Sequence, residues 1–128
     1  PGTEPDTAVT VIRASLAKKD AQELLGKLDD ALVRADVDAY VAMLGADLAS
    51  VEKANLREFL KEVADVKVTR SPAVSIMPVE GGYSVASEYA IEYRIQNVPV
   101  KAEILAQYVF VRNASGAWTI QSVSSRRK

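Results

Sequence analysis

The clearest pattern in the sequence lies at residues 85–95, whose sequence is VASEYAIEYRI. On an extended chain, one side would carry aliphatic and aromatic side chains, namely Val85, Tyr89, Ile91, Tyr93 and Ile95. The other side would carry small and charged ones, namely Ala86, Glu88, Glu92 and Arg94. Because successive side chains of a strand point to opposite faces, this alternation predicts a β-strand with one face turned towards a core.

Three further extended segments flank this strand, at residues 66–76, 100–112 and 117–123. The first segment bends at Ser71-Pro72, and a proline there favours an edge strand or a bulge because it cannot donate to the ladder. The second segment is apolar on both sides towards its end, as in a strand covered twice or at a dimer surface. Short turn sequences separate the segments. We therefore expect a four-stranded antiparallel sheet in the second half of the chain.

The first half has helical spacing instead. We expect helices that begin near Thr7, Asp20, Asp36 and Ser50. Asp20 and Asp36 are suited to cap their helices, since short acceptor side chains bind the free N–H groups of a helix start. Gly45 lies where a glycine commonly ends a helix, here the third one. Helices followed by an antiparallel sheet indicate the α+β class, with N-terminal helices packed on the sheet.

The length of 128 residues suits a single domain. We expect a linker at residues 1–6, one α+β domain at residues 7–124 and a basic tail at residues 125–128. Residues 1–65 carry 8 Lys or Arg against 13 Asp or Glu, a net charge of −5, and residues 66–128 carry 8 against 4, a net charge of +4. Three cations of the second half are the terminal Arg126, Arg127 and Lys128. This clustering is too small to predict nucleic-acid binding.

Two absences limit the chemistry, because the sequence contains no histidine and no cysteine. Disulfides, thiolate ligands, most zinc sites and histidine-dependent triads are thereby excluded. No apolar run approaches the roughly 20 residues that a membrane helix needs, so we predict no membrane span in this chain. Glu88 and Glu92 could approach a metal ion, but two carboxylates without further oxygen ligands bind one poorly, and cross-strand ion pairs on a solvated or dimer-facing surface explain them better.

Two stretches carry a resemblance to a known family. Residues 28–44, LDDALVRADVDAYVAML, combine a helix that ends in a small residue and Asp with a short helix that carries an aromatic residue and a leucine. Residues 108–120, YVFVRNASGAWTI, have the form of a closing hairpin. The sequence thereby resembles the nuclear transport factor 2-like (NTF2-like, SnoaL-like) superfamily, which includes ketosteroid isomerases and polyketide cyclases.

This resemblance implies a cystatin-like cone, in which a curved sheet and helices enclose a cavity, and it implies no cofactor. The superfamily usually has a short strand pair between its second and third helices. Residues 45–50 leave no room for that pair, so we expect a cut-down variant with a smaller or partly open pocket.

Four tyrosines are the candidate ligand-binding residues. Tyr89, Tyr93 and Tyr108 alternate with aliphatic residues on strand faces expected to line the cone, and Tyr40 can meet them from the short helix. Four phenols around one cavity could bind a small apolar ligand. The alternative is that each ring packs in the core with its hydroxyl at a rim, which is the usual fate of a buried tyrosine.

The carboxylates near the expected cone are Asp29, Asp30, Asp36 and Asp38. Asp36 is better explained as a cap, and Asp29 and Asp30 as a solvated helix face. A general base needs a desolvated site as well as a carboxylate, so we predict no catalytic residue.

From these observations we expect a non-catalytic ligand-binding or accessory module of NTF2-like type that forms a homodimer through its sheet face. The proline-rich start and basic end fit a module of a larger envelope or secreted protein, extracytoplasmic if an upstream signal or anchor was removed. One alternative is a small cofactor-free isomerase or cyclase that uses Tyr and Asp in the cone. Another is a protein-interaction adaptor that acts through the outer sheet face.

Overall fold

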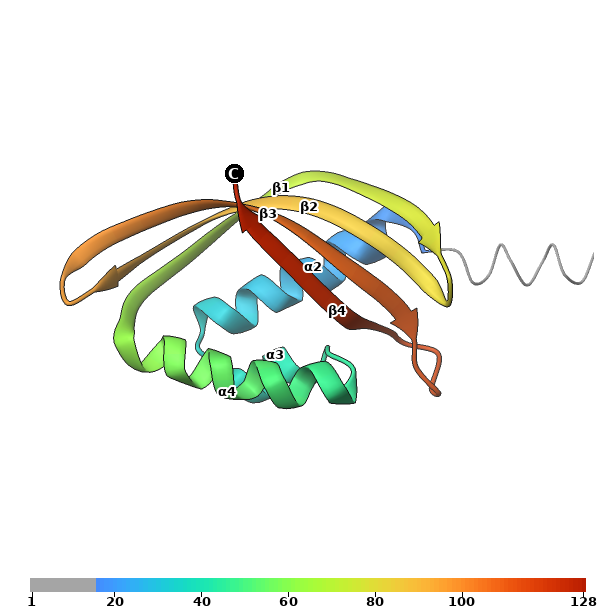
Figure 1. Ribbon diagram of the computed structural model, residues 1–128, viewed down its shortest axis with the longest axis horizontal. Helices are drawn as coiled ribbons and strands as arrows, with labels where there is room; N and C mark the ends of the chain where they lie inside the picture. Colours follow the sequence, from blue (N-terminus) through green and yellow to red (C-terminus); the bar gives the residue numbers. More distant parts are fainter. Residues whose placement is uncertain (1–15) are drawn as a thin grey trace, which may run out of the picture.

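The computed structural model describes residues 16–128, and its elements follow the predicted order of helices and then strands (Figure 1). The helices are α2 (Lys18–Val33), α3 (Val37–Val41) and α4 (Ala46–Glu62). The strands are β1 (Val63–Val79), β2 (Gly82–Ile95), β3 (Val98–Arg112) and β4 (Trp118–Arg127). The predicted α+β class is confirmed. The expected linker at residues 1–6 and the helix expected from Thr7 lie outside the described residues.

The four strands form one antiparallel sheet in the order β1-β2-β3-β4, so β1 and β4 are its edges. Figure 1 shows the sheet arching over α2, with α3 and α4 further below. The predicted curved meander is therefore confirmed. We call the space between the inner side of the sheet and the helices the cone.

The alternation at residues 85–95 appears as predicted. Val85 is fully buried whereas Ala86 is exposed. In the β2–β3 register Val85 lies opposite Tyr108 and Tyr89 opposite Ile104. Because directly opposed residues of a ladder share a face, these side chains line the inner side of the sheet.

Helix α2 supplies most of the helical part of the core. It buries Ala21, Leu25, Leu28 and Ala31, which recur at the spacing of one helix face. These residues belong to the same buried cluster as Val85, Phe110 and Ile120 of the sheet. Full burial of one leucine side chain contributes about 2 kcal/mol, so this contact fixes α2 against the inner side of the sheet.

The predicted start of α2 is wrong, whereas the predicted cap of α3 is confirmed. Helix α2 begins at Lys18, so Asp20 lies in its first turn and does not cap it. The helix starts earlier than the local signal because Ala21 packs in the core and fixes the preceding turn. At α3 the Asp36 Oδ1 accepts a hydrogen bond from the Ala39 N–H at 3.1 Å, as a capping side chain does.

The turn between α2 and α3 has the two hydrogen bonds of a Schellman motif. The Asp36 N–H donates to the Ala31 carbonyl at 2.9 Å, and the Ala35 N–H donates to the Leu32 carbonyl at 3.1 Å. Ala35 has a φ of 58°. This left-handed conformation is the one in which glycine is usually found, so Ala35 carries backbone strain.

The predicted start of α4 at Ser50 and the predicted role of Gly45 are also wrong. Helix α4 begins at Ala46, and Gly45 is its N-cap rather than the end of α3. The Gly45 N–H donates to the Ile120 carbonyl of β4 at 2.8 Å, which holds the glycine extended and sets the start of the helix. Ser50 lies inside α4, where its hydroxyl donates to the Ala46 carbonyl at 3.2 Å.

Strand β1 is an edge strand with two irregularities. Its register with β2 shifts between Arg70 and Val74, at the bend predicted for Ser71-Pro72. A second shift, between Ala64 and Lys67, includes Asp65 with a φ of 56°. Bulges increase the local twist, so both shifts curve β1 around the helices.

Strand β4 is longer than predicted, because it runs to Arg127 and takes residues 125–127 of the expected basic tail into the sheet. Within residues 16–128, the segment between α3 and α4 contains no strand pair. It makes only an isolated parallel bridge between Leu44 and Ile120 of β4. The expected cut-down arrangement is thus confirmed in the described part of the chain.

Candidate functional site

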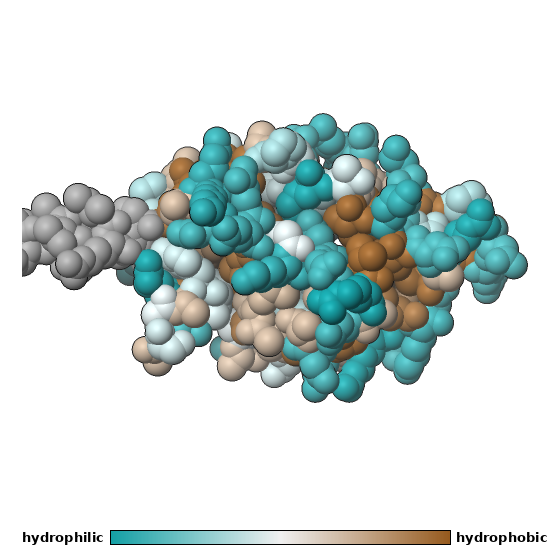
Figure 2. Space-filling model, turned by 180° about the vertical axis from the view of Figure 1, so that it is seen from behind, coloured by the Kyte–Doolittle hydropathy of each residue, from teal (hydrophilic) through white to brown (hydrophobic). Residues whose placement is uncertain are grey.

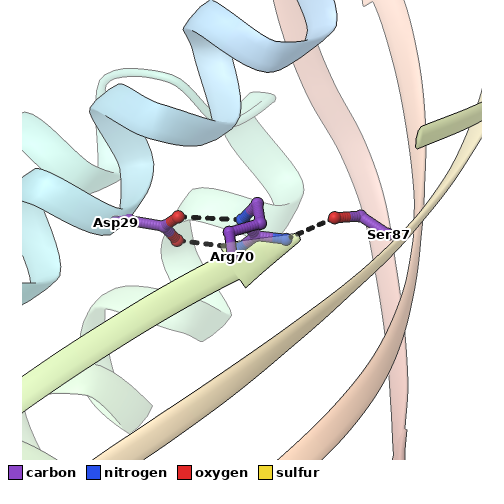
Figure 3. Close-up of polar contacts among 3 residues, drawn as sticks. All are labelled: Asp29, Arg70 and Ser87. Carbon is purple, nitrogen blue, oxygen red and sulfur yellow. Dashed lines mark hydrogen bonds and ion pairs between the residues drawn. The ribbon is translucent and has the colours of Figure 1, made fainter. Parts of the chain in front are cut away.

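An ion pair between a carboxylate and a guanidinium lies inside the cone. The Arg70 Nε and Nη2 donate to the Asp29 Oδ2 and Oδ1, each at 2.8 Å, so both carboxylate oxygens are engaged (Figure 3). Only 11% of the Arg70 side chain and 17% of the Asp29 side chain are exposed. The prediction that Asp29 belongs to a solvated helix face is therefore wrong, whereas its neighbour Asp30 is exposed.

The fold brings this pair together from α2 and β1. Asp29 follows Leu25 by four residues, so it lies on the buried face of α2. Arg70 lies opposite Tyr89 in the β1–β2 register, which places it on the inner side of the sheet. The register shift that follows Arg70 bends β1 at this level. The ion pair therefore ties helix to sheet beside the bulge.

Arg70 also contacts three residues of β2 and β3. Its Nη1 donates to the Ser87 Oγ at 3.0 Å (Figure 3). Its guanidinium carbon lies 4.5 Å from the ring centroid of Tyr89 and 5.5 Å from that of Tyr108. Cation–π contacts of this length are favourable and orient the rings around the guanidinium. Burial lowers the pKa of Arg70, but the hydrogen bonds to Asp29 and the charge of its carboxylate, together with the neighbouring Tyr108, outweigh this and raise the pKa above its ordinary value, so Arg70 stays charged.

Tyr108, which is buried, and Tyr40 and Tyr89, which are half-buried, stay protonated at neutral pH. Burial raises the pKa of Tyr108 to about 12, although Arg70 acts in the opposite direction. Burial likewise raises the pKa of Tyr89 and, more strongly, that of Tyr40. The neighbouring Tyr108 phenol and the Glu52 carboxylate, on α4, raise the pKa of Tyr40 further. Each hydroxyl is therefore a hydrogen-bond donor rather than a base.

Three of the four predicted tyrosines thus gather around one feature. Tyr40 from α3, Tyr89 from β2 and Tyr108 from β3 interact electrostatically with one another, and Asp29 acts on all three. Tyr93 lies elsewhere, because its ring packs edge-on against Phe59 of α4 with centroids 5.1 Å apart. We call Asp29, Arg70, Ser87, Tyr40, Tyr89 and Tyr108 the phenol site.

No family model matches the chain, and no curated protein sequence matches it. An NTF2-like protein from Cytophaga hutchinsonii superposes with a TM-score of 0.72 at 15% identity, covering 89% of this chain and 100% of that one. A putative scytalone dehydratase from Novosphingobium aromaticivorans gives 0.70 at 16% identity, covering 97% and 88%. A structure from Catenulispora acidiphila in complex with S-DNPA gives 0.73 at 13% identity, covering 85% and 91%.

The chain has the NTF2-like fold. The resemblance of residues 28–44 and 108–120 is confirmed at this level. Proteins that share the NTF2-like fold include a ligand complex and a protein described as a dehydratase, so the fold by itself selects neither binding nor catalysis.

The NTF2-like cone is less closely packed at the end that α4 covers. Several large apolar side chains there are only half buried, namely Phe59, Leu60, Ile91, Ile95 and Val100. Figure 2 shows apolar atoms gathered around a hollow on the half of the molecule nearer the β2–β3 hairpin.

The outer side of the sheet carries a separate trough of about 730 Å³ that crosses all four strands. Its floor consists of small residues such as Ala73, Ser75, Ala86 and Ser124. Near its rim Glu88 forms an ion pair with a residue just beyond β4, since the Lys128 Nζ lies 2.9 Å from the Glu88 Oε2. Within residues 16–128 no three acidic side chains approach closely enough to hold a metal ion.

The sequence prediction missed Asp29 and Arg70, although a signal was present. Asp29 lies on the apolar helix face that carries Leu25 and Leu28. Arg70 lies two residues after Val68, on the strand face that carries Val66 and Val68. A charged residue on the apolar face of a helix and an opposite charge on the apolar face of a strand are expected to pair, because an unpaired buried charge is costly.

Of the helices within residues 16–128, none is at once long enough and apolar enough to cross a bilayer.

Proposed function

We propose that this domain is a non-catalytic binding module whose cone takes a small, uncharged and largely apolar molecule carrying a hydrogen-bond acceptor. The observation that carries the proposal is a pair of unused donors. The hydroxyls of Tyr40 and Tyr89 make no hydrogen bond within residues 16–128, and no unpaired side-chain oxygen there is sealed from solvent. Both hydroxyls can therefore donate to a ligand that enters the cone.

The charges of the phenol site favour an uncharged ligand. Arg70 and Asp29 neutralise each other, and the phenols are neutral at physiological pH. Glu52 adds a negative charge near Tyr40, which disfavours an anion. The half-buried apolar residues at the α4 end would contact the body of the ligand. A structural neighbour that is described with a bound small molecule is consistent with this use of the fold.

The same contacts argue against acid–base catalysis. Both oxygens of Asp29 already accept hydrogen bonds from Arg70, so this carboxylate is poorly placed to take a proton from a substrate. The raised phenol pKa values leave no phenolate at neutral pH. The site can hold and orient a carbonyl group without abstracting a proton from it.

Prodan is a suitable probe, because it combines a naphthalene ring with a carbonyl acceptor and its emission reports the polarity around it. We expect saturable binding to the full chain with blue-shifted, enhanced emission. Tyr40→Phe and Tyr89→Phe each remove one donor and keep the ring, so each is expected to weaken binding about fivefold, the equivalent of one net hydrogen bond. Tyr93→Phe is the matched control and is expected to bind like the parent. Unsaturable binding, or equal losses in all three variants, would contradict the proposal.

The isomerase or cyclase alternative has one observation in its favour, namely a carboxylate inside the cone. An Asp29 that acts as a base would catalyse exchange of the α-protons of a bound ketone. This exchange can be followed by NMR with 2-acetylnaphthalene in heavy water. The binding proposal predicts exchange at the background rate. Exchange above background that disappears in Asp29→Asn would favour the enzyme.

For the outer side of the sheet we propose the homodimer contact. The floor of small side chains would let the sheet of a second copy approach closely, and the trough spans all four strands. Sedimentation of the full chain at micromolar concentration is expected to show a species of twice the 13.8 kDa chain mass. Ala86→Arg would fill the floor and return the chain to a monomer. A parent chain that sediments only as the 13.8 kDa species would exclude the dimer.

A further inference from the structure

The two edges of the sheet differ in how they are protected. The β1 edge carries Pro72 and Pro78, contains two register shifts, and has Gln22 of α2 donating to the Pro72 carbonyl at 2.6 Å. Prolines, bulges and a covering element are the usual means of preventing an edge from pairing with another chain. The β1 edge is therefore closed.

The β4 edge has this protection only at its start. The Ile120 N–H donates to the Met43 carbonyl at 2.9 Å, and the Ile120 carbonyl accepts from the Gly45 N–H at 2.8 Å. Chain 43–45 thus occupies the position of a fifth strand beside Ile120. It then turns away into α4, which begins at Ala46. From Gln121 to Arg127 every residue of β4 is exposed.

Odd and even residue numbers show which main-chain N–H and C=O groups of this open stretch point towards β3 and which point away from it. The Lys128 N–H donates to the Glu103 carbonyl, so the odd-numbered residues of β3 point towards β4. The even-numbered residues of β3 therefore point away from β4. Their partners in β4 are Val123, Ser125 and Arg127, and these point their N–H and C=O groups away from the sheet. Ile120, opposite Phe110, follows the same rule, as its bonds to Met43 and Gly45 confirm.

The charges along this edge are of one sign. Strand β4 contains no acidic residue, and Arg126 and Arg127 form no ion pair within residues 16–128. Lys128 is already engaged by Glu88. A second copy of β4 would bring no carboxylate to these arginines, whereas an acidic strand would pair with both. Arg126 lies on the outer face and Arg127 on the inner face, so consecutive acids of one extended segment can reach both.

We propose that the β4 edge from Ser122 to Arg127 is a docking site for an extended acidic segment of a partner protein, which adds to the sheet as a fifth strand. Main-chain bonds to Val123, Ser125 and Arg127 supply the binding. Acidic side chains opposite Arg126 and Arg127 supply the selectivity. This site is separate from the cone, and it adjoins the β4 end of the outer trough, which Ser124, Ser125 and Arg126 also line.

The proposal can be tested with the full chain and the peptide Ac-Glu-Glu-Thr-Thr-Val-Thr-NH2, which aligns antiparallel with its acids opposite the two arginines. We expect saturable binding by fluorescence anisotropy, weaker in about 0.5 M than in about 0.05 M NaCl because salt screens exposed charges. NMR is expected to show shifts concentrated at the amides of Val123, Ser125 and Arg127. Shifts confined to the cone, or to the part of the outer trough on β1, β2 and β3, would overturn the proposal.

Two controls separate strand addition from nonspecific attraction. A peptide N-methylated at its first, third and fifth residues loses the donors that face β4 and is expected to bind more than about tenfold more weakly. The variant Arg126→Glu/Arg127→Glu is expected to weaken binding about tenfold, whereas Arg57→Glu/Lys67→Glu, with the same change of net charge, is expected to leave it unchanged. Equal binding of the methylated peptide, or equal losses in the two double variants, would refute the docking site.

Discussion

Helices α2 and α4 are of nearly equal length but cover the sheet differently. Helix α2 buries four of its 16 residues, and α4 buries one of its 17, Leu56. In addition, α2 carries the carboxylate that pairs with Arg70, whereas the side-chain ion pairs of α4, such as Lys61 with Glu58, lie on its exposed surface. The comparison indicates that α2 holds the helical layer against the sheet, whereas α4 contributes much less to the buried core.

The largest expected effect is at the centre of the α2 contact. Leu25 is fully buried, so Leu25→Ala is expected to lower the free energy of unfolding by about 3 kcal/mol through lost burial and a remaining cavity. Leu60→Ala, at a half-buried position of α4, is expected to cost about 1 kcal/mol or less. Urea denaturation of both variants measures the difference. Equal losses would show that the two helices contribute alike.

The next effect distinguishes two neighbouring carboxylates of α2. Asp29→Asn leaves the Arg70 charge without its partner inside the cone and is expected to cost about 2 kcal/mol. Asp30 pairs with Arg34 at 3.0 Å on the surface, with 64% of its side chain exposed, so Asp30→Asn is expected to change stability by less than about 0.5 kcal/mol. The comparison uses the same denaturation assay. A larger loss for Asp30→Asn would contradict the assignment of the site.

The phenol site also predicts a dependence on alkaline pH. The folded chain holds the Tyr108 pKa at about 12, above the ordinary 10.0, so between these pH values it keeps a proton that the unfolded chain loses. Stability attributable to Tyr108 is complete below pH 10 and falls as the pH rises towards 12, by on the order of 2 kcal/mol. Denaturation midpoints of the parent and Tyr108→Phe should therefore approach each other as the pH rises. Parallel curves would argue against a buried phenol.

The smallest effect concerns the ends of the two helices. Ala35 has a left-handed conformation after α2, so Ala35→Gly is expected to raise the free energy of unfolding by about 1 kcal/mol. Ala54 is exposed in the interior of α4, where Ala54→Gly is expected to lower it by about the same amount. Thermal unfolding of both variants shows whether each substitution raises or lowers the stability. A loss of stability in Ala35→Gly would mean that the turn is not strained.

Much of the fold was predictable because its signals are local. The alternation at residues 85–95 fixes the inner and outer sides of β2, and Asp36 caps α3 within four residues of chain. The starts of α2 and α4 were mispredicted because tertiary contacts determine them. Gly45, for example, is held by a bond to Ile120, which no local pattern reveals.

The candidate site was predictable only in part. Alternation placed Tyr89 and Tyr108 on the inner side of the sheet, and it placed Tyr93 there as well. It could not show that Phe59 would occupy the space beside Tyr93, because that depends on how α4 crosses the sheet. The pair was missed since Asp29 was assigned to a solvated helix face and Arg70 was not considered as its partner. The pairing of Asp29 with Arg70, 41 residues apart, can be predicted only when the faces of the helix and of the strand are considered together.

The Asp29–Arg70 pair has a consequence for engineering. It joins two positions 41 residues apart, and the intervening chain contains the whole of α3 and α4. Because both ends of this segment are held at the phenol site, lengthening it would add only about 0.6 kcal/mol of closure entropy for each doubling of the length of the whole segment. Different helices could therefore be substituted at this place while the sheet and α2 remain a constant scaffold.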